Sequence, residues 1–459
     1  MPDLTKTMKE NLMNMRKTLL GATVMVALAA SLAGPLAQAA ANEQFFPVLV
    51  YRTGPYGPNG VPWANGYVDY LKMINVRDGG VNGVKLTWEE CETAYATDRG
   101  VECYERLKGK GPTGATVVQP LSTGVTFALT EKAPKDKIPL ITAGYGRSES
   151  ADGAVFKWNF PMLGTYWTAA DIIVQALIKR EGGAGKLKGK TIALVYHDSP
   201  YGKEPIAMLE ARSKMHGFKF IKLPVTHPGV EQKATWLQVR RERPDYVLLW
   251  GWGVMNATAL KEAVATAYPL DRMYGVWWSG AEPDVKDVGE SAKGYNALAM
   301  QYGAGVGKVQ QDILKYVYDK NNGTGARDLV GQVLYNRGLY SAMLAVEGVR
   351  RSQEQYGKKP MTGEQVRWGL ENLNLNDAAL KRLGIEGQLR PLRTTCDDHM
   401  GSSWARMQTW DGKKWVMHDA WYEADMQIIK PMVREAAAKY AKEHNIAPRD
   451  CAKEMTSGS

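Results

Sequence analysis

The sequence predicts an α/β protein built from two lobes. Apolar runs that read as strands alternate with segments of helical periodicity along the 459 residues, a pattern typical of a sheet with helices on both faces. A glycine-rich linker at 182–189 interrupts the alternation, and a fresh series of strands begins after it. The length also allows two domains of ordinary size. We therefore expect two lobes with a cleft between them.

The part of the chain before the linker predicts a first series of strands, each followed by a loop rich in Gly, Ser or Thr. The expected strands are 46–51, 84–88, 115–119, 139–143 and 155–158. Helices are expected at 67–76 and 165–179. Since open α/β sheets bind ligands at the carboxyl ends of their strands, the loops should gather at such an edge.

The part after the linker predicts a second series. The expected strands are 191–196, 246–250 and 273–277, and the expected helices between them are 233–242 and 256–267. The run 295–301 should lead back to the first lobe, where helices follow at 335–355 and 363–372. Asp411-Gly412 predicts a hairpin that joins 405–409 to 415–418. An alanine-rich helix at 431–444, with Pro431 in its first turn, completes the series.

The N-terminal segment has the three parts of a secretory signal. Arg16 and Lys17 precede an apolar run at 19–32, and Ala37-Gln38-Ala39 forms an A-x-A cleavage site. We expect a signal peptide over 1–39 and a periplasmic mature protein. A membrane anchor is the alternative interpretation, but the apolar run is shorter than a membrane span.

Charge and cysteine content narrow the class further. The net charge of +10 is spread along the chain, without the concentrated basic face and motif that nucleic-acid binding requires. The four cysteines lie in the exported part, where oxidation is expected, and permit three pairings. Cys91 with Cys103 would close a short loop, and Cys396 with Cys451 would attach the C-terminal tail. A metal site formed by Cys396, Asp398 and His399 is the alternative, although its spacing is unlike that of zinc sites.

Three groups of motifs carry a resemblance to a known family. They are Thr53-Gly54-Pro55 with Gly79-Gly80-Val81-Asn82-Gly83, Ile192-Ala193-Leu194-Val195 with Tyr201-Gly202, and Pro244-Asp245-Tyr246-Val247. In this order and spacing the chain resembles the branched-chain amino acid binding proteins, which have the type I periplasmic binding fold. The resemblance implies two Rossmann-like lobes joined by three crossovers. Lobe 1 would span 42–162 and 302–390, lobe 2 would span 163–301 and 391–430, and 431–459 would form a C-terminal helix and tail.

The resemblance also implies a ligand site. The expected contacts are Asn59, Ser122, Thr123, Gly144, Tyr145, Tyr201, Trp252, Trp278 and Glu282. Ser122 and Thr123, in a loop beyond a strand end, would hold a carboxylate or carbonyl; an ordinary hydroxyl-capped turn is the alternative. Glu282 lies near the position of the family's ammonium-binding acid.

Aromatic residues mark a departure from the amino acid binders. Trp252, Trp277 and Trp278 gather at strand ends, and Tyr145 adds another ring. Large aromatic faces suit flat or apolar ligands, although each tryptophan alone is also typical of a packed core. We expect an aromatic or extended organic acid or an amide rather than a small aliphatic amino acid. Arg147 is a further candidate contact or a surface arginine.

The expected function is that of a periplasmic solute-binding protein of an ABC importer. Its partners would be a small ligand and an inner-membrane permease; a monomer is expected, without nucleic acid, cofactor or metal. A ligand sensor of the same fold is the alternative. An exported enzyme is a further one, but the sequence has no G-x-S-x-G or H-E-x-x-H motif and predicts no catalytic residue.

Overall fold

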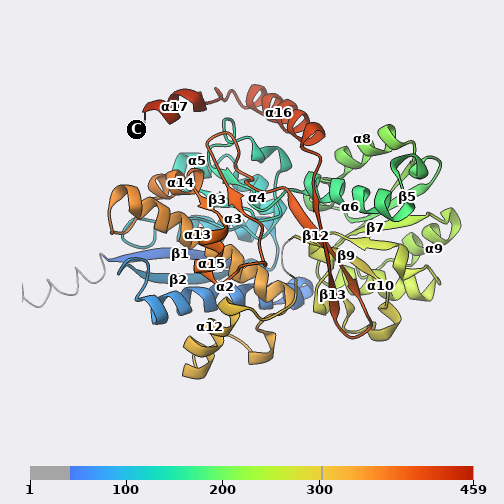
Figure 1. Ribbon diagram of the computed structural model, residues 1–459, viewed down its shortest axis with the longest axis horizontal. Coiled ribbons are helices and arrows are strands. Elements are labelled where there is room, and N and C mark those ends of the chain that lie inside the picture. The colour runs from blue at the N-terminus through green and yellow to red at the C-terminus, as the bar shows by residue number, and fades with distance from the viewer. Residues whose placement is uncertain (1–41, 301–302, 458–459) are drawn as a thin grey trace, which may run out of the picture.

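The computed structural model describes residues 42–300 and 303–457. Its ribbon forms two lobes that lie side by side (Figure 1). The predicted signal peptide at 1–39 lies outside the described residues. Among the residues that are described, no helix combines the length and the apolar character needed to cross a membrane.

Lobe 1 contains a parallel sheet flanked by helices. Its strands are β1 (Glu43–Val50), β2 (Lys85–Glu92), β3 (Leu140–Ile141) and β4 (Asn159–Phe160). β1 pairs with β2 and β3 with β4, and the extended segment around Ala115 and Val118 bridges β1 to β3. The helices of the first half of this lobe are α2 (Gly57–Asp78), α3 (Thr97–Leu107), α4 (Thr123–Leu129) and α5 (Ala133–Asp136).

The chain returns to lobe 1 after β9. The returning elements are α12 (Lys308–Tyr316), α13 (Val333–Tyr356), α14 (Gly363–Glu371), β10 (Asn374–Leu375), α15 (Asp377–Leu383) and β11 (Leu392–Arg393). The long helix α13 packs against α2 at two glycines. A Cβ atom on Gly66 would lie 2.0 Å from the Tyr335 carbonyl oxygen, and one on Gly338 would lie 1.8 Å from that of Trp63. Only glycine therefore allows the two helices to approach this closely.

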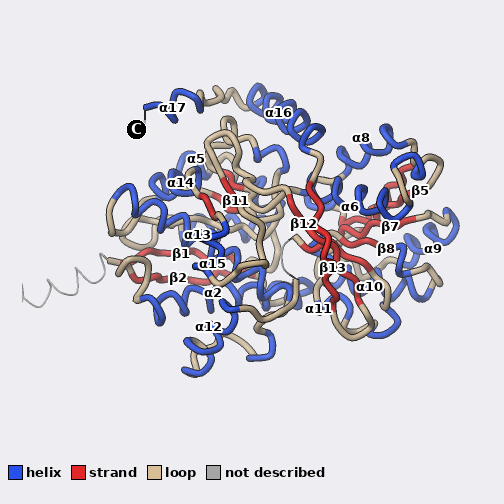
Figure 2. Tube along the Cα trace, in the orientation of Figure 1, coloured by secondary structure: helices blue, strands red, loops and turns tan. Residues whose placement is uncertain are grey.

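Lobe 2 is built on a seven-stranded sheet with the order β13-β12-β9-β8-β7-β5-β6. Its strands are β5 (Thr191–His197), β6 (Lys219–Val225), β7 (Tyr246–Trp250), β8 (Met273–Gly275), β9 (Asn296–Ala299), β12 (Trp404–Trp410) and β13 (Trp415–Glu423). The strands from β5 to β9 are parallel, and the β12–β13 hairpin adds an antiparallel edge. The helices are α6 (Tyr166–Glu181), α7 (Pro200–Lys203), α8 (Ile206–His216), α9 (Lys233–Glu242), α10 (Val254–Ala265) and α11 (Glu282–Val285). Helices lie on both faces of the sheet (Figure 2).

The α/β fold class, most predicted elements and the hairpin at Asp411-Gly412 are confirmed, with several differences in detail. Helix α2 begins at Gly57, ten residues before the predicted start at 67. The predicted strand 155–158 is a turn, and strand pairing begins only at Asn159. The predicted strand 115–119 forms isolated bridges rather than a continuous strand. β8 stops at Gly275, because residues Trp277–Ser279 turn into a 3-10 helix. The edge strand β6 was not predicted; its Lys219, Lys222 and Pro224 interrupt the apolar pattern, as is usual on a sheet edge.

A C-terminal strap runs from lobe 2 across to lobe 1 (Figure 1, red). We use this name for α16 (Met426–Glu443) and α17 (Cys451–Ser457) with the segment between them. The first helix begins five residues earlier than predicted, because the Asp425 side chain caps the Gln427 N–H. Pro431 therefore lies inside the helix rather than in its first turn.

Both predicted disulfides are present. Cys91 is bonded to Cys103, and Cys396 is bonded to Cys451, which attaches the strap to the crossover before β12. The alternative metal site is wrong, because the Cys396 sulfur is used in the disulfide. The His399 ring nitrogens lie 2.7 Å from the Asn159 carbonyl oxygen and 3.3 Å from a Glu371 carboxylate oxygen. No metal-binding cluster of His, Cys, Asp or Glu occurs within 42–300 or 303–457.

Candidate ligand-binding site

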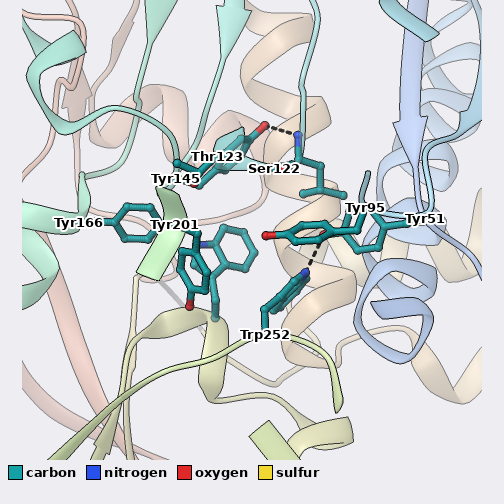
Figure 3. A pocket seen from close by; sticks show the side chains of 10 residues that line it. Tyr51, Tyr95, Ser122, Thr123, Tyr145, Tyr166, Tyr201 and Trp252 are labelled. Atoms are coloured by element: carbon teal, nitrogen blue, oxygen red, sulfur yellow. Dashed lines mark hydrogen bonds between the residues drawn. The ribbon is translucent and has the colours of Figure 1, made fainter. Parts of the chain in front are cut away.

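A small cavity, with about 20 Å³ open to the centre of a water-sized sphere, lies between the two lobes (Figure 3). It is lined by Tyr51, Tyr95, Leu121, Ser122, Thr123, Tyr145, Tyr166, Tyr201, Trp252 and Trp278. These residues lie in loops or first helical turns that follow strands of both sheets, where open α/β sheets hold ligands. The cavity is therefore an aromatic chamber with a few hydroxyl groups.

The local structure of lobe 1 fixes its side of the chamber. Ser122 is the N-cap of α4, and its hydroxyl oxygen accepts from the Val125 N–H at 3.4 Å. Thr123 follows, and its hydroxyl oxygen accepts from the Gly146 N–H at 3.3 Å. Tyr95 and Leu121 both adopt positive φ angles, of 62° and 49°. Such backbone conformations are costly for residues other than glycine and tend to gather at functional sites.

Two predicted contacts from lobe 2 approach from the opposite side. The Trp252 and Trp278 rings meet edge to face at a centroid distance of 5.3 Å. Gly144 belongs to lobe 1 and does not line the cavity, but its carbonyl oxygen accepts from the indole N–H groups of both Trp277 and Trp278, at 2.7 and 2.8 Å. Trp277 is buried and lies outside the cavity lining, so packing accounts for this tryptophan.

The predicted contacts divide into two groups. Those that line the cavity are Ser122, Thr123, Tyr145, Tyr201, Trp252 and Trp278. Asn59 and Glu282 line a separate surface groove instead. The Asn59 amide donates to Asp284 at 3.1 Å, and the Glu282 carboxylate accepts from the Val333 N–H at 3.1 Å. Arg147 also lies away from the cavity, between the rings of Phe127 and Tyr440.

Sequence reasoning missed four residues of the lining: Tyr51, Tyr95, Leu121 and Tyr166. Tyr51 directly follows β1, and Tyr166 opens α6 behind the capping residue Thr165. Both positions adjoin predicted elements, so attention to aromatic residues beside strand and helix ends could have found them. Tyr95 and Leu121 carry no comparable signal.

Direct contacts close the lobes over the cavity. The Trp252 indole donates to the Tyr51 hydroxyl at 3.1 Å, and the Tyr56 hydroxyl lies 2.7 Å from His197 Nε2. The buried Arg337 guanidinium donates to the Trp277 carbonyl oxygen and lies over the Trp278 ring. The structure thus shows the lobes in contact across the site.

Where the two lobes meet, burial shifts the pKa values of titratable groups in the direction that favours their neutral forms. Burial, together with the neighbouring His227, lowers the pKa of His197 to about 4. Burial raises the pKa of Glu282 to about 7 and that of Asp284 to about 6. None of these groups lines the cavity. The lining residues of the described chain include no base paired with a nucleophile.

The environment of Glu204 should make the stability of the protein depend on pH. Its carboxylate, from lobe 2, accepts from the Ser148 N–H at 3.0 Å and the Ser148 hydroxyl at 2.7 Å. Burial, followed by repulsion from Glu149, raises the pKa of Glu204 to about 8, although the nearby Arg147 opposes this. Because the folded pKa exceeds the unfolded value, the contribution of Glu204 to stability is present below pH 4.5 and is lost as the pH rises through 8.

We therefore expect Glu204→Gln to be more stable than the parent protein at pH 9. The expected gap is roughly 1–2 kcal/mol, less than the full shift because the residue keeps some contact with solvent. This difference in the free energy of unfolding should shrink as the pH is lowered from 9 to 5. Urea unfolding across this pH range measures it. Glu210→Gln, an exposed carboxylate paired with Lys222, is the control and should show no pH-dependent gap. A gap for Glu204→Gln that stays constant with pH would contradict the assignment.

Comparisons with known proteins agree with this architecture. The model of the periplasmic binding protein family matches residues 43–414. A crystal structure from the Pseudomonas fluorescens group, described as an ABC transporter permease, is 43% identical to this chain. Its alignment covers 89% of this chain and 99% of that one, with a TM-score of 0.83. No curated protein sequence matches significantly.

More distant structures share the fold. A branched-chain amino acid ABC transporter protein from Thermus thermophilus, solved with bound valine, is 20% identical, covers 85% of this chain and 99% of its own, and has a TM-score of 0.71. A solute-binding protein from R. palustris in complex with benzoate is 16% identical, covers 82% of this chain and 95% of its own, and has a TM-score of 0.64.

Proposed function

Because this chain belongs to the periplasmic binding protein family, we propose that it captures a small carboxylate-bearing molecule between its lobes and delivers it to the permease of an ABC importer. The observation that carries the proposal is the aromatic cavity at the seam of the two lobes. The ligand classes included are aromatic or extended organic acids, amino acids and amides. Valine and benzoate in the structures of distant relatives are consistent with this range.

Location and assembly follow from the same proposal. The family implies a periplasmic location, and we propose that the leader at 1–39 directs export and is then removed. The protein would act as a monomer and carry its ligand to an inner-membrane permease. We propose binding without catalysis, as is the rule in a family of solute-binding proteins.

Closure of the lobes is the proposed mechanism. Lobe 1 (42–162 and 302–390, together with β11) and lobe 2 (163–301 and the remainder of 391–430) would move as two bodies. Both lobes supply cavity walls, so a ligand touching both makes contacts that only the closed form provides. Such differential contact shifts the population toward closure. The seam contacts Trp252–Tyr51 and Tyr56–His197 support this view, since each joins one lobe to the other.

A thermal-shift screen tests the proposal. The mature protein is stripped of ligand by unfolding and refolding, and then melted with organic acids, amino acids, amides and polyols. A ligand that binds only the native state at 100 times its Kd should stabilise it by about 2.7 kcal/mol and raise the melting temperature. We expect a selective rise with acids or amides. If no compound in the screen raised the melting temperature, the result would count against solute binding.

Substitution of Trp252 by alanine locates the site. Trp252 is 3% exposed, and its indole packs edge to face against Trp278 and Tyr51. Removing a buried aromatic anchor typically costs about 2 kcal/mol of binding, or about 30-fold in affinity. Trp368→Ala, on the remote helix α14, is the control and should leave affinity unchanged. If the melting temperature of the unliganded Trp252→Ala protein also fell sharply, the tryptophan would support the fold. Trp252 would then be a core residue instead of a ligand contact.

A further inference from the structure

We infer that the cavity selects a flat organic acid that lacks an amino group, and therefore that this protein discriminates against amino acids. This inference rests on the proposed function and narrows its ligand class. It follows from the division of the cavity into two walls. One wall presents hydroxyl groups, whereas the other presents aromatic surface whose polar atoms are already bonded.

One wall consists of Tyr201, Trp252 and Trp278, all from lobe 2. The Tyr201 hydroxyl donates to the Gly251 carbonyl oxygen at 2.8 Å. The indole N–H of Trp252 donates to Tyr51, and that of Trp278 donates to the Gly144 carbonyl oxygen at 2.8 Å. Every donor on this wall is thus satisfied within the protein. What remains for a ligand is ring surface, which suits a flat apolar body.

The opposite wall carries hydroxyl protons that lack a partner. Tyr51 accepts from Trp252, but its own proton has no acceptor among the described residues. The Tyr95 hydroxyl lies beside that of Ser122. The Tyr166 hydroxyl, which lobe 2 contributes from the start of α6, lies beside that of Thr123. Two hydroxyls that bond to each other use one proton and leave the other free. Since unpaired buried donors are costly, this wall favours a ligand with hydrogen-bond acceptors, such as a carboxylate.

No carboxylate is available to balance an ammonium group. Among the residues that the structure describes, those lining the cavity include no acidic or basic side chain. The neighbouring acids are committed elsewhere. Asp284 accepts from Asn59, Asn256 and the Ala281 N–H, and Glu282 binds the Val333 N–H with both oxygens. A buried ammonium without a counter-ion is strongly unfavourable.

A further observation argues against a cationic ligand. The Arg337 guanidinium lies 5.0 Å from the centre of the Trp278 ring, which lines the cavity, so a cation stacked on this ring would meet a like charge. Burial lowers the pKa of Arg337 only to about 9, which leaves it charged at neutral pH.

A matched set of ligands tests the inference. Phenylacetate, mandelate and phenylglycine share a ring and a carboxylate and differ at the α-carbon, which carries hydrogen, hydroxyl or ammonium. Calorimetric titration of the ligand-stripped mature protein should give the tightest binding for phenylacetate or mandelate. Phenylglycine should bind at least about 100-fold more weakly, because its ammonium is desolvated without a partner. Valine and trimethylanilinium should behave like phenylglycine.

The outcomes separate this inference from the proposed function. Equal or tighter binding of phenylglycine or valine overturns the inference but keeps a solute-binding protein. Preferential binding of trimethylanilinium also overturns it, since the rings would then hold a cation. Absence of binding by phenylacetate and mandelate overturns it as well, whereas the proposed function fails only if the broader screen also finds no ligand.

The hydroxyl wall can be tested separately. Tyr95→Phe removes one hydroxyl and keeps the ring, so affinity for the preferred acid should fall about 10-fold with an unchanged melting temperature of the unliganded protein. Tyr356→Phe, at an exposed position, is the control. Unchanged affinity in Tyr95→Phe would contradict a role for this wall in holding the carboxylate.

Discussion

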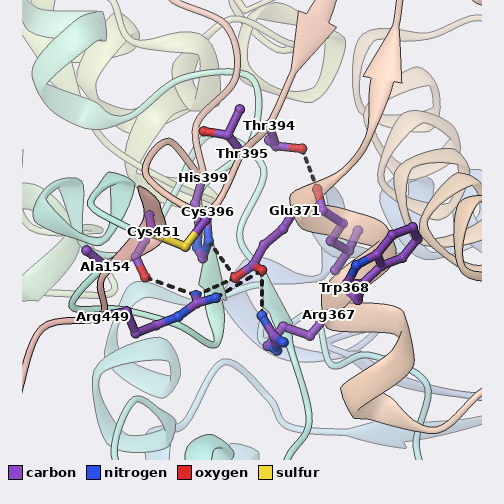
Figure 4. A network of polar contacts seen from close by, with 12 residues as sticks. Ala154, Arg367, Trp368, Glu371, Thr394, Thr395, Cys396, His399, Arg449 and Cys451 are labelled. Carbon is purple, nitrogen blue, oxygen red and sulfur yellow. Dashed lines mark hydrogen bonds and ion pairs between the residues drawn. A yellow bond between two sulfur atoms is a disulfide. The ribbon is translucent and has the colours of Figure 1, made fainter. Parts of the chain in front are cut away.

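Replacing Glu371 with glutamine should lower the free energy of unfolding by about 3–5 kcal/mol. The buried Glu371 carboxylate, at the end of α14, forms ion pairs with Arg449 of the strap at 2.6 Å and with Arg367 at 2.5 Å (Figure 4). His399 approaches to 3.3 Å. Glutamine preserves the shape but leaves these guanidinium groups without the shared carboxylate. Arg449 keeps Glu454 as a partner, whereas Arg367 has no other ion pair within the described chain. Urea unfolding at pH 7 measures the loss.

The pH dependence of this loss identifies the carboxylate as its cause. Burial alone would raise the pKa of Glu371, but hydrogen bonds from His399 and Arg449 outweigh burial and hold the pKa well below its usual range. A pKa lowered in the folded state gives stability that is present above the unfolded value of about 4 and lost as the pH falls below it. The gap between the parent protein and Glu371→Gln should therefore narrow toward pH 3.

The control for this prediction lies on the same helix. Glu364 is exposed and pairs with Lys137 at 3.1 Å. Glu364→Gln should change stability by no more than about 0.5 kcal/mol. If both variants lost the same free energy of unfolding, α14 would be sensitive to any such substitution. The buried ion-pair cluster would then not be the cause of the loss.

The fold could be predicted from sequence because its signals are local. The buried strand β7 is an unbroken apolar run with the bounds that the sequence predicts, and β5 contains such a run at 192–196. Edge strand β6 was missed because solvent exposure permits lysines and a proline there. The short β4 was misplaced because only two residues pair, which is too few to produce a periodic pattern.

The site was harder to predict, since its geometry depends on contacts between distant segments. Ser122, Tyr201 and Trp252 follow strands and are found in the cavity lining. Glu282 occupies the expected loop, yet its carboxylate binds the start of α13, more than fifty residues away in sequence. Tyr95 reaches the cavity through a left-handed backbone conformation. Neither of these features leaves a mark in the local sequence.

Removing the disulfide between Cys396 and Cys451 should destabilise the protein by about 4 kcal/mol. This bond links residues 55 positions apart, and the entropy of closing so long a loop in the unfolded chain predicts a loss of that size. The paired variant Cys396→Ser with Cys451→Ser is compared with Cys91→Ser and Cys103→Ser, whose 12-residue separation predicts about 3 kcal/mol. Urea unfolding under oxidising conditions measures both. A smaller loss for the longer loop would contradict the entropic account.

The same disulfide should be coupled energetically to Glu371. The family model ends at residue 414, before the strap. Arg449 and Cys451 are neighbours on the strap, and each is anchored to lobe 1 or to the crossover before β12. If the ion pair and the disulfide both hold the same segment, removing one of them already frees that segment. Removing the other then costs less stability than it would in the parent protein. Combining Glu371→Gln with the Cys396 and Cys451 substitutions should therefore cost at least about 0.5 kcal/mol less than the sum of the separate effects. Strict additivity would show that the ion pair and the disulfide stabilise the protein independently.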